Sequence, residues 1–145
     1  MRFTVEAICL SEKRGQQKKP VEMAELVKNF GIKGDAHAGQ GHRQVSFLAS
    51  EDIEEMETEG LEFEPGDFAE NIITRGIDWT RVNVGGQVFI GEAEMEVIQI
   101  GKECPKPCEI FFKAGRCIMP ERGIFTRVIK GGTIHAGDRG HYRIG

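Results

Sequence analysis

Short alternating stretches bounded by glycine run through most of this chain, and they constrain its fold more than any other feature. In "GQVFIGEAEMEVIQIG", Val88 and Ile90 come before Gly91-Glu92, after which Met95 and Val97 alternate with glutamates. Apolar residues at every second position indicate strands, and a glycine turn between two such runs indicates a hairpin. Nineteen glycines among 145 residues provide many tight turns. The pattern predicts a mainly β protein with a closed or nearly closed barrel, rather than a βαβ sheet.

Further strands are expected on both sides of this hairpin. Residues 2–10 alternate, which places Phe3, Val5 and Ala7 on one face, and residues 44–49 ("QVSFLA") form a second short strand. Near the end of the chain, "IFTRVIKGGTIHAGDRGHYRI" predicts another hairpin, with Gly131-Gly132 as its two-residue turn.

A few short helices are expected between the strands. Apolar residues at helical spacing predict one helix over residues 23–30, ending before Gly31. Ser50 is placed to cap a second helix, "EDIEEMETE", which ends at Gly60.

Length and charge limit the function classes. A chain of 145 residues with 39% apolar and 29% charged residues is typical of one globular domain, here residues 1–145. The net charge of −4 argues against nucleic-acid binding. No signal-peptide region or membrane span is visible, so a cytoplasmic protein with reduced cysteines is expected.

Three of the four cysteines lie in "IGKECPKPCEIFFKAGRC" and raise three chemical alternatives. A disulfide between Cys104 and Cys108 is disfavoured, because the two prolines keep the segment extended and separate the α-carbons by about 13 Å. Zinc is disfavoured as well, because the spacing C-x3-C-x8-C lacks a C-x2-C pair, although the histidines could supply a distant ligand. Cys9, inside a strand, is expected to be a core residue.

A reactive thiolate at Cys108 is the third alternative. "PCEIFFKAG" predicts a short helix with Pro107 at its first position and Gly115 just after its end. Cys108 would then lie in the first turn, where free N–H groups stabilise a thiolate, and Lys102 and Lys106 add positive charge. A buried, inert cysteine is the plain alternative.

Six segments occur in an order that resembles the MOSC domain family, the C-terminal domains of molybdenum-cofactor sulfurases. They are "GIKGDAHAG", "HRQVSFL", "GDFAENI", "VGGQVFIGEAEMEV", "PCEIF" and "VIKGGTIHAGD", and together they span residues 31–138. The resemblance implies a mostly β, barrel-like fold and a link to the molybdenum cofactor (molybdopterin).

The resemblance also implies site residues. Cys108 matches the family's reactive cysteine, which ligates molybdenum in some members and is proposed to carry a persulfide sulfur in others; Cys117 is the rival. Candidate cofactor-binding residues are Lys33, Asp35, His37, Arg43, Asn71 and Arg127. Arginine and lysine suit a phosphate, and Asn and Asp suit the pterin heterocycle.

Two chemistries and one alternative follow from the resemblance. Cys108 would either ligate molybdenum in the reduction of N-hydroxylated compounds or relay sulfur to the cofactor. The alternative is a non-catalytic module that binds or delivers the cofactor. Since the family-like region begins almost at Met1, a sulfur donor is expected to be a partner: a cysteine desulfurase, which would carry the pyridoxal phosphate, or another protein of cofactor biosynthesis.

Overall fold

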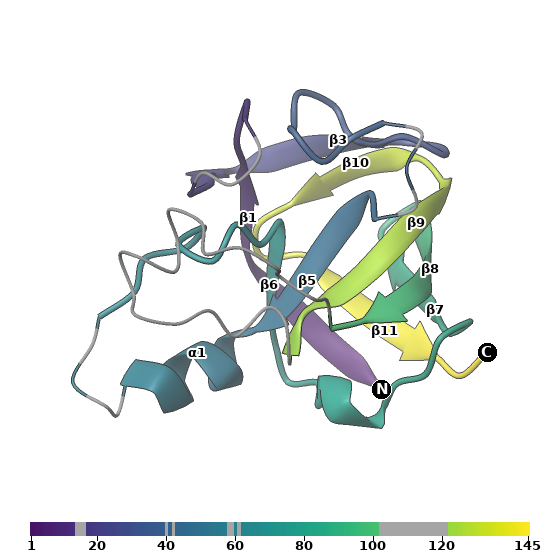
Figure 1. Ribbon diagram of the computed structural model, residues 1–145. Helices are drawn as coiled ribbons and strands as arrows, with labels where there is room; N and C mark the ends of the chain where they lie inside the picture. Colours follow the sequence, from purple (N-terminus) through teal and green to yellow (C-terminus); the bar gives the residue numbers. More distant parts are fainter. Residues whose placement is uncertain (14–16, 40, 42, 58–59, 61, 102–121) are drawn as a thin grey trace.

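The structure is a computed structural model that describes residues 1–13, 17–39, 41, 43–57, 60, 62–101 and 122–145 (Figure 1). The strands are β1 (Arg2–Leu10), β2 (Lys19–Val21), β3 (Met23–Val27), β4 (Gly31–Ile32), β5 (Val45–Ala49), β6 (Ile72–Arg75), β7 (Gln87–Ile90), β8 (Ala93–Ile100), β9 (Ile124–Lys130), β10 (Gly132–His135) and β11 (Arg139–Arg143). Helix α1 (Ser50–Glu57) and the 3₁₀ turn η1 (Trp79–Arg81) are the helical elements of the described residues. No described helix has the length and apolar character needed to cross a membrane.

Seven strands close into a barrel. Their order is β11-β7-β8-β9-β5-β6-β1, and β1 pairs with β11 to complete the circle. Only β5 and β6 run parallel; every other neighbouring pair in the barrel is antiparallel. Strand β2 extends the sheet beside the end of β1, and β10-β3-β4 form a separate three-stranded sheet. The predicted mainly β, barrel-like fold is confirmed.

The first strand differs in detail from the prediction. Phe3 and Val5 are buried as expected, but the register against β6 shifts between Val5 and Ala7. This bulge places one extra residue in β1, so Ile8 rather than Ala7 continues the buried row. The alternation of apolar and polar residues in the sequence does not reveal a bulge of this kind.

The helix predicted over residues 23–30 is wrong. Residues Met23–Val27 form β3, which pairs with β10 on one side and with β4 on the other. Ala24 and Leu26 are buried, whereas Met23, Val27 and Phe30 are exposed. Pairing with strands distant in the sequence outweighs the helical spacing of these apolar side chains.

The hairpin predicted at Gly131-Gly132 is also wrong, since β10 pairs with β3 and not with β9. A Cβ at Gly131 would lie 2.5 Å from the carbonyl oxygen of Leu26. The glycine is therefore required where the chain passes close to the β3 backbone. The hairpin predicted around Gly91-Glu92 is confirmed, with Ile90 opposite Ala93.

Two apolar clusters stabilise the barrel. The larger fills its interior, and Trp79 from η1 closes one end, with Phe3, Phe47 and Tyr142 at ring distances of 5.9, 5.4 and 6.4 Å. The smaller lies on the outer side of β5 and β9, beneath α1 and the chain that follows it. Its buried members are Leu48, Met56, Phe68, Ala69 and Phe125.

Helix α1 begins at Ser50, as the sequence indicates. The Ser50 hydroxyl accepts a hydrogen bond from Arg75 at 2.9 Å. Gly60 has a positive φ of 92°, and its N–H donates to Glu57, which is consistent with the chain turning away there.

Candidate functional site

The candidate residues from the sequence occupy three places. Asp35, His37 and Asn71 gather at the end of the barrel where β1 finishes and β5 and β6 begin. Arg43 and Arg127 lie on the outer side of β9. Lys33 is 73% exposed and lies 4.0 Å from Glu25.

Asp35 forms a fully buried ion pair that the sequence did not indicate. Its Oδ1 lies 2.7 Å from Nζ of Lys18, and neither side chain is exposed to solvent. Ser11 completes the cluster: its N–H donates to Asp35 Oδ1 at 3.0 Å, and its hydroxyl accepts from Lys18 at 3.2 Å. The backbone N–H of His37 donates to the second carboxylate oxygen at 3.1 Å. The cluster thus fixes the start of the glycine-rich loop against the end of β1.

The surroundings of Asp35 favour its ionised form. Burial alone would raise the pKa, but hydrogen bonds from Lys18, Ser11 and Asn71 and the nearby ammonium hold the pKa of Asp35 below its usual value. For Lys18, burial lowers the pKa, and Asp35 partly offsets this. The carboxylate and the ammonium therefore depend on each other, and removing one partner would leave an uncompensated buried charge.

Asn71 joins three strands. Its side-chain amide donates to the carbonyl of Cys9 in β1 at 3.1 Å, and its Oδ1 accepts from the backbone N–H of Ser46 in β5 at 3.0 Å. The backbone N–H of Asn71, just before β6, donates to the Ser46 hydroxyl. An asparagine offers both a donor and an acceptor, so one side chain bridges β1 and β5.

Two further buried titratable groups lie beside this cluster. Glu70 is completely buried and accepts from the N–H groups of Gly66 and Phe68, both at 3.0 Å. Burial nevertheless dominates and raises the pKa of Glu70 to about 7. Burial, together with Glu70, also raises the pKa of the Cys9 thiol to about 12, so Cys9 is an unreactive core residue, as predicted.

His37 is the member of this group that reaches solvent. Its side chain is 28% exposed, and its Nδ1 lies 3.9 Å from Asp35 Oδ2. The buried ion pair anchors the backbone of the loop, and the loop presents His37 at the surface of the barrel end.

Arg43 and Arg127 share one outer face. The guanidinium of Arg43 lies 5.8 Å from the centre of the Phe125 ring, and Arg127 follows Phe125 by two positions in β9. Side chains two apart in a strand point to the same side. Arg127 Nη2 contacts Glu96 at 2.9 Å, while its Nε is inaccessible to solvent and has no hydrogen-bond partner among the described residues.

Gln44 fixes the glycine-rich loop to β9. Its side-chain oxygen accepts from the N–H of Val128 at 3.0 Å, and its amide nitrogen donates to Gly41 at 2.9 Å. Because Arg43 directly precedes Gln44, these bonds hold its backbone beside Arg127.

Cys108 and its rival Cys117 lie outside the described residues, as do the helix predicted at "PCEIFFKAG" and the disulfide and zinc alternatives. The segment that carries them connects β8 to β9. Its flanks are joined by a hydrogen bond of 2.7 Å from the N–H of Gly101 to the carbonyl of Gly123.

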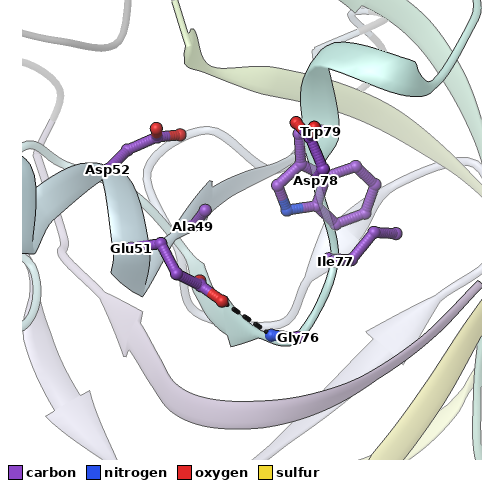
Figure 2. A pocket seen from close by; sticks show the side chains of 7 residues that line it. All are labelled: Ala49, Glu51, Asp52, Gly76, Ile77, Asp78 and Trp79. Carbon is purple, nitrogen blue, oxygen red and sulfur yellow. Dashed lines mark hydrogen bonds between the residues drawn. The ribbon is translucent and has the colours of Figure 1, made fainter.

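A hollow of about 320 Å³ opens between the start of α1 and η1 (Figure 2). Ala49, Ile77 and Trp79 supply apolar walls, and Glu51, Asp52 and Asp78 supply carboxylates. Glu51 accepts from the N–H of Gly76, and Asp78 accepts from Thr80. The hollow therefore contains none of the candidate residues from the sequence. No group of three or more potential ligands that could hold a metal ion occurs among the described side chains.

Lys18 and Glu70 are the residues that sequence reasoning missed. Lys18 stands in "SEKRGQQKKP", a polar stretch that predicts a solvated loop. Nothing in its sequence neighbourhood indicates that Asp35, seventeen positions away, lies 2.7 Å from it. Glu70 precedes Asn71 in the family-like segment "GDFAENI". That segment is the one sequence feature that could have pointed to Glu70.

The family comparison covers most of the chain. The family model described as the MOSC domain matches residues 33–140, from the glycine-rich loop into β11. The chain belongs to the MOSC domain family. MOSC domains are associated with molybdenum cofactor sulfurase-like proteins. No curated protein matches the chain.

Solved structures share the fold of this MOSC domain. The YuaD protein from Bacillus subtilis is similar with a TM-score of 0.82 and 18% identity, over 98% of this chain and 96% of that one. YiiM from Geobacillus stearothermophilus has a TM-score of 0.73 and 20% identity, over 94% and 72% of the two chains. YiiM from Escherichia coli has a TM-score of 0.71 and 20% identity, over 99% and 70%.

Proposed function

We propose that this MOSC domain binds the molybdenum cofactor, with Arg43 and Arg127 holding its phosphate and Cys108 acting as the reactive group. The observation that carries the proposal is the pair of arginines on the outer side of β9, where the side chain of Arg127 is 43% exposed and that of Arg43 lies over Phe125. A guanidinium left with unused donors suits a phosphate, which offers several acceptor oxygens.

The other candidate residues differ in how well they fit such a ligand. His37 reaches solvent and could contact a bound heterocycle. Asp35 and Asn71 are buried, and their polar atoms already bond to Lys18, Ser11, Ser46 and Cys9. We infer that these two residues hold the loop that presents His37 and Arg43. Their direct contact with the cofactor stays a prediction, as does that of Lys33.

Cys108 would act in one of two ways. As a molybdenum ligand, its thiolate would hold the metal during reduction of N-hydroxylated compounds. As a sulfur carrier, the same thiolate would take the sulfane sulfur of a persulfide on a cysteine desulfurase, and the partner's thiolate would leave. The bound cofactor supplies a redox-active metal centre. Both actions need a thiol that is accessible and ionised near neutral pH.

Cofactor content tests the proposed binding site. The chain would be expressed in a host that makes the molybdenum cofactor, and bound molybdenum and the fluorescent oxidised pterin would be measured. Arg43→Ala/Arg127→Ala is expected to retain at least about tenfold less pterin, because two charge-assisted contacts are lost. Lys130→Ala removes an exposed cation from the same strand and serves as the matched control. Equal pterin in all three proteins would contradict the site.

A Cys108→Ser variant separates the alternatives. Loss of molybdenum with retention of pterin would support metal ligation. A labile mass increase of about 32 Da on Cys108, after incubation with a cysteine desulfurase that contains pyridoxal phosphate, would support sulfur transfer. If wild type and Cys108→Ser hold equal pterin and neither shows metal-linked or sulfur chemistry, the domain is a non-catalytic binding or delivery module.

A further inference from the structure

The charges of this chain are distributed very unevenly. Residues 51–70 contain ten acidic residues and no lysine or arginine. Since the whole chain has 23 acidic and 19 basic residues, the remainder has 13 acidic against 19 basic and is net positive by six. A net charge of −4 therefore conceals one strongly acidic region on an otherwise basic molecule.

Within residues 51–70 the structure describes α1, residue 60 and residues 62–70, and we call these described residues the acidic lobe. A few of its carboxylates have partners: Glu54 pairs with Arg75 at 2.8 Å, Glu51 bonds to Gly76, and Glu70 is buried. Others, such as Glu62 and Glu64, lie exposed. The lobe thus presents a surface of excess negative charge.

The counterpart is a face on the outside of β1, β11 and β7, which we call the basic face. It consists of the outward side chains Arg2, Phe89, Arg139, His141 and Arg143. Arg2 pairs across the strands with His141, and His141 with Phe89. Along β11 the exposed residues recur at every second position, about 7 Å apart.

Contacts within the basic face order its side chains without neutralising them. The Phe89 and His141 rings stack at 4.7 Å, and Arg143 lies 5.4 Å from the centre of the Phe89 ring and bonds to Gln87. Among the described residues, Arg2, Arg139 and Arg143 form no ion pair. Two acidic side chains flank the face: Glu6 is paired with Arg75, whereas Glu94, opposite Phe89, accepts a hydrogen bond from the neutral Gln87 amide and keeps its charge.

We propose that the basic face docks the acidic lobe of a second copy of this chain, which gives an electrostatically driven self-association. Helix α1 and strand β7 lie on opposite sides of the barrel (Figure 1), and no ion pair among the described residues joins the acidic lobe to Arg2, Arg139 or Arg143. An interface of standard size buries roughly 800 Å² per partner, about a tenth of this chain's 7914 Å² surface. The basic face extends over three neighbouring strands of the barrel, β1, β11 and β7.

Charge selects a second copy rather than a nucleic acid. A polyanion attracted to the basic face has no positive surface to pair with the acidic lobe, which would repel it. A second copy instead pairs its acidic lobe with the basic face, and the lobe and the face that stay free can each take a further copy.

The test compares oligomeric state by sedimentation at about 100 µM chain, in about 0.02 M and about 0.5 M NaCl. Wild type is expected to associate at low salt and to dissociate at high salt. Arg139→Glu/Arg143→Glu and Glu62→Arg/Glu64→Arg are each expected to weaken self-association at least about tenfold at low salt. An equimolar mixture of the two variants is expected to form a heterodimer, because each restores the charge that the other lacks.

Lys28→Glu/Lys130→Glu is the matched control, since it makes the same change in net charge at exposed lysines outside the basic face. It is expected to associate as wild type does. Monomeric wild type at low salt, or a control that dissociates as fully as Arg139→Glu/Arg143→Glu, would overturn the proposal. So would a monomeric wild type that binds a fluorescent oligouridine through Arg139 and Arg143, which would identify the face as a nucleic-acid site.

Discussion

Four buried polar side chains, those of Lys18, Asp35, Glu70 and Asn71, lie near one end of the barrel. Each meets the cost of burial with hydrogen bonds from the protein, and most of these bonds join segments that are far apart in the sequence. Lys18 and Asp35 fix the start of the glycine-rich loop, and Glu70 fixes the turn at Gly66 and Phe68.

Glu70 is expected to make the stability of the protein depend on pH. Burial raises its pKa from 4.5 to about 7, so the folded state keeps a proton that the unfolded chain releases between these pH values. The free energy of unfolding should therefore fall as pH rises through this window, by about 3 kcal/mol in total from this group. Glu70→Gln abolishes this contribution.

Urea denaturation of wild type and Glu70→Gln between pH 4.5 and 8 measures the effect. The difference between the two unfolding free energies should shift in favour of the variant as pH rises. The exposed Glu64→Gln controls for the loss of one acidic group. Parallel pH profiles for Glu70→Gln and wild type would show that the buried carboxyl does not titrate in this range.

At the level of single residues, the sequence predicted six cofactor-binding residues. The structure brings Asp35, His37 and Asn71 to the same end of the barrel, whereas Arg43 and Arg127 lie on the outer side of β9 and Lys33 is exposed beside Glu25. The sequence did not predict Lys18 or Glu70. A lysine in a polar stretch and a glutamate in an acidic one have the composition of a solvated surface, and only long-range contacts bury them.

At the level of elements, the chain segment around Gly66 determines how the acidic lobe returns to the barrel. The N–H of Lys18 donates to the carbonyl of Gly66 at 2.8 Å. A Cβ at Gly66 would lie 1.9 Å from the Lys18 carbonyl oxygen, and its φ of +93° is in the left-handed region. Close approach and backbone conformation therefore both require glycine here.

Gly66→Ala and Gly34→Ala separate these two requirements. Gly34 has a φ of +89°, but a Cβ at this position would have no atom within 4 Å, so its substitution should cost only the left-handed penalty of about 1–2 kcal/mol. Gly66→Ala should lose about 1–3 kcal/mol more, because the backbone of Lys18 must move. Chemical denaturation of both variants measures the difference. Equal losses would mean that the contact with Lys18 relaxes without cost.

The observed strands and helices agree with the sequence prediction where alternation of apolar residues or a glycine turn was clear. The hairpin of β7 and β8, the strand β1 and the start of α1 agree with the sequence, because alternation and glycine turns act over short range. Strand β3 and the connection at Gly131 do not agree. In both cases the strands that pair, β3 and β10, lie about a hundred residues apart along the chain, and local spacing cannot report that pairing.

On the scale of the whole molecule, Trp79 connects distant parts of the barrel. Its ring contacts Phe3 in β1, Phe47 in β5 and Tyr142 in β11, and its Nε1 donates to Thr74 at 2.8 Å. Trp79→Ala is expected to destabilise the entire fold by about 3–5 kcal/mol, because it leaves a cavity at the end of one continuous core.

Far-ultraviolet circular dichroism should follow this unfolding, since Trp79 is the only tryptophan of the chain and its fluorescence is lost with it. Trp79→Phe is expected to cost less, because it keeps an aromatic ring and loses only the bond to Thr74 and the volume of the second ring. A loss below about 1 kcal/mol for Trp79→Ala would show that the end of the barrel relaxes around the missing ring.

The sequence by itself determined the fold class, the position of most strands and the family, because alternation, glycine turns and ordered motifs are local properties. Only the tertiary structure decided how the barrel closes between β1 and β11, which charges are buried, and where the basic face and the acidic lobe lie. These depend on contacts between residues far apart in the chain. The energy of such contacts comes from burial and pairing in three dimensions, and no short stretch of the sequence contains both partners.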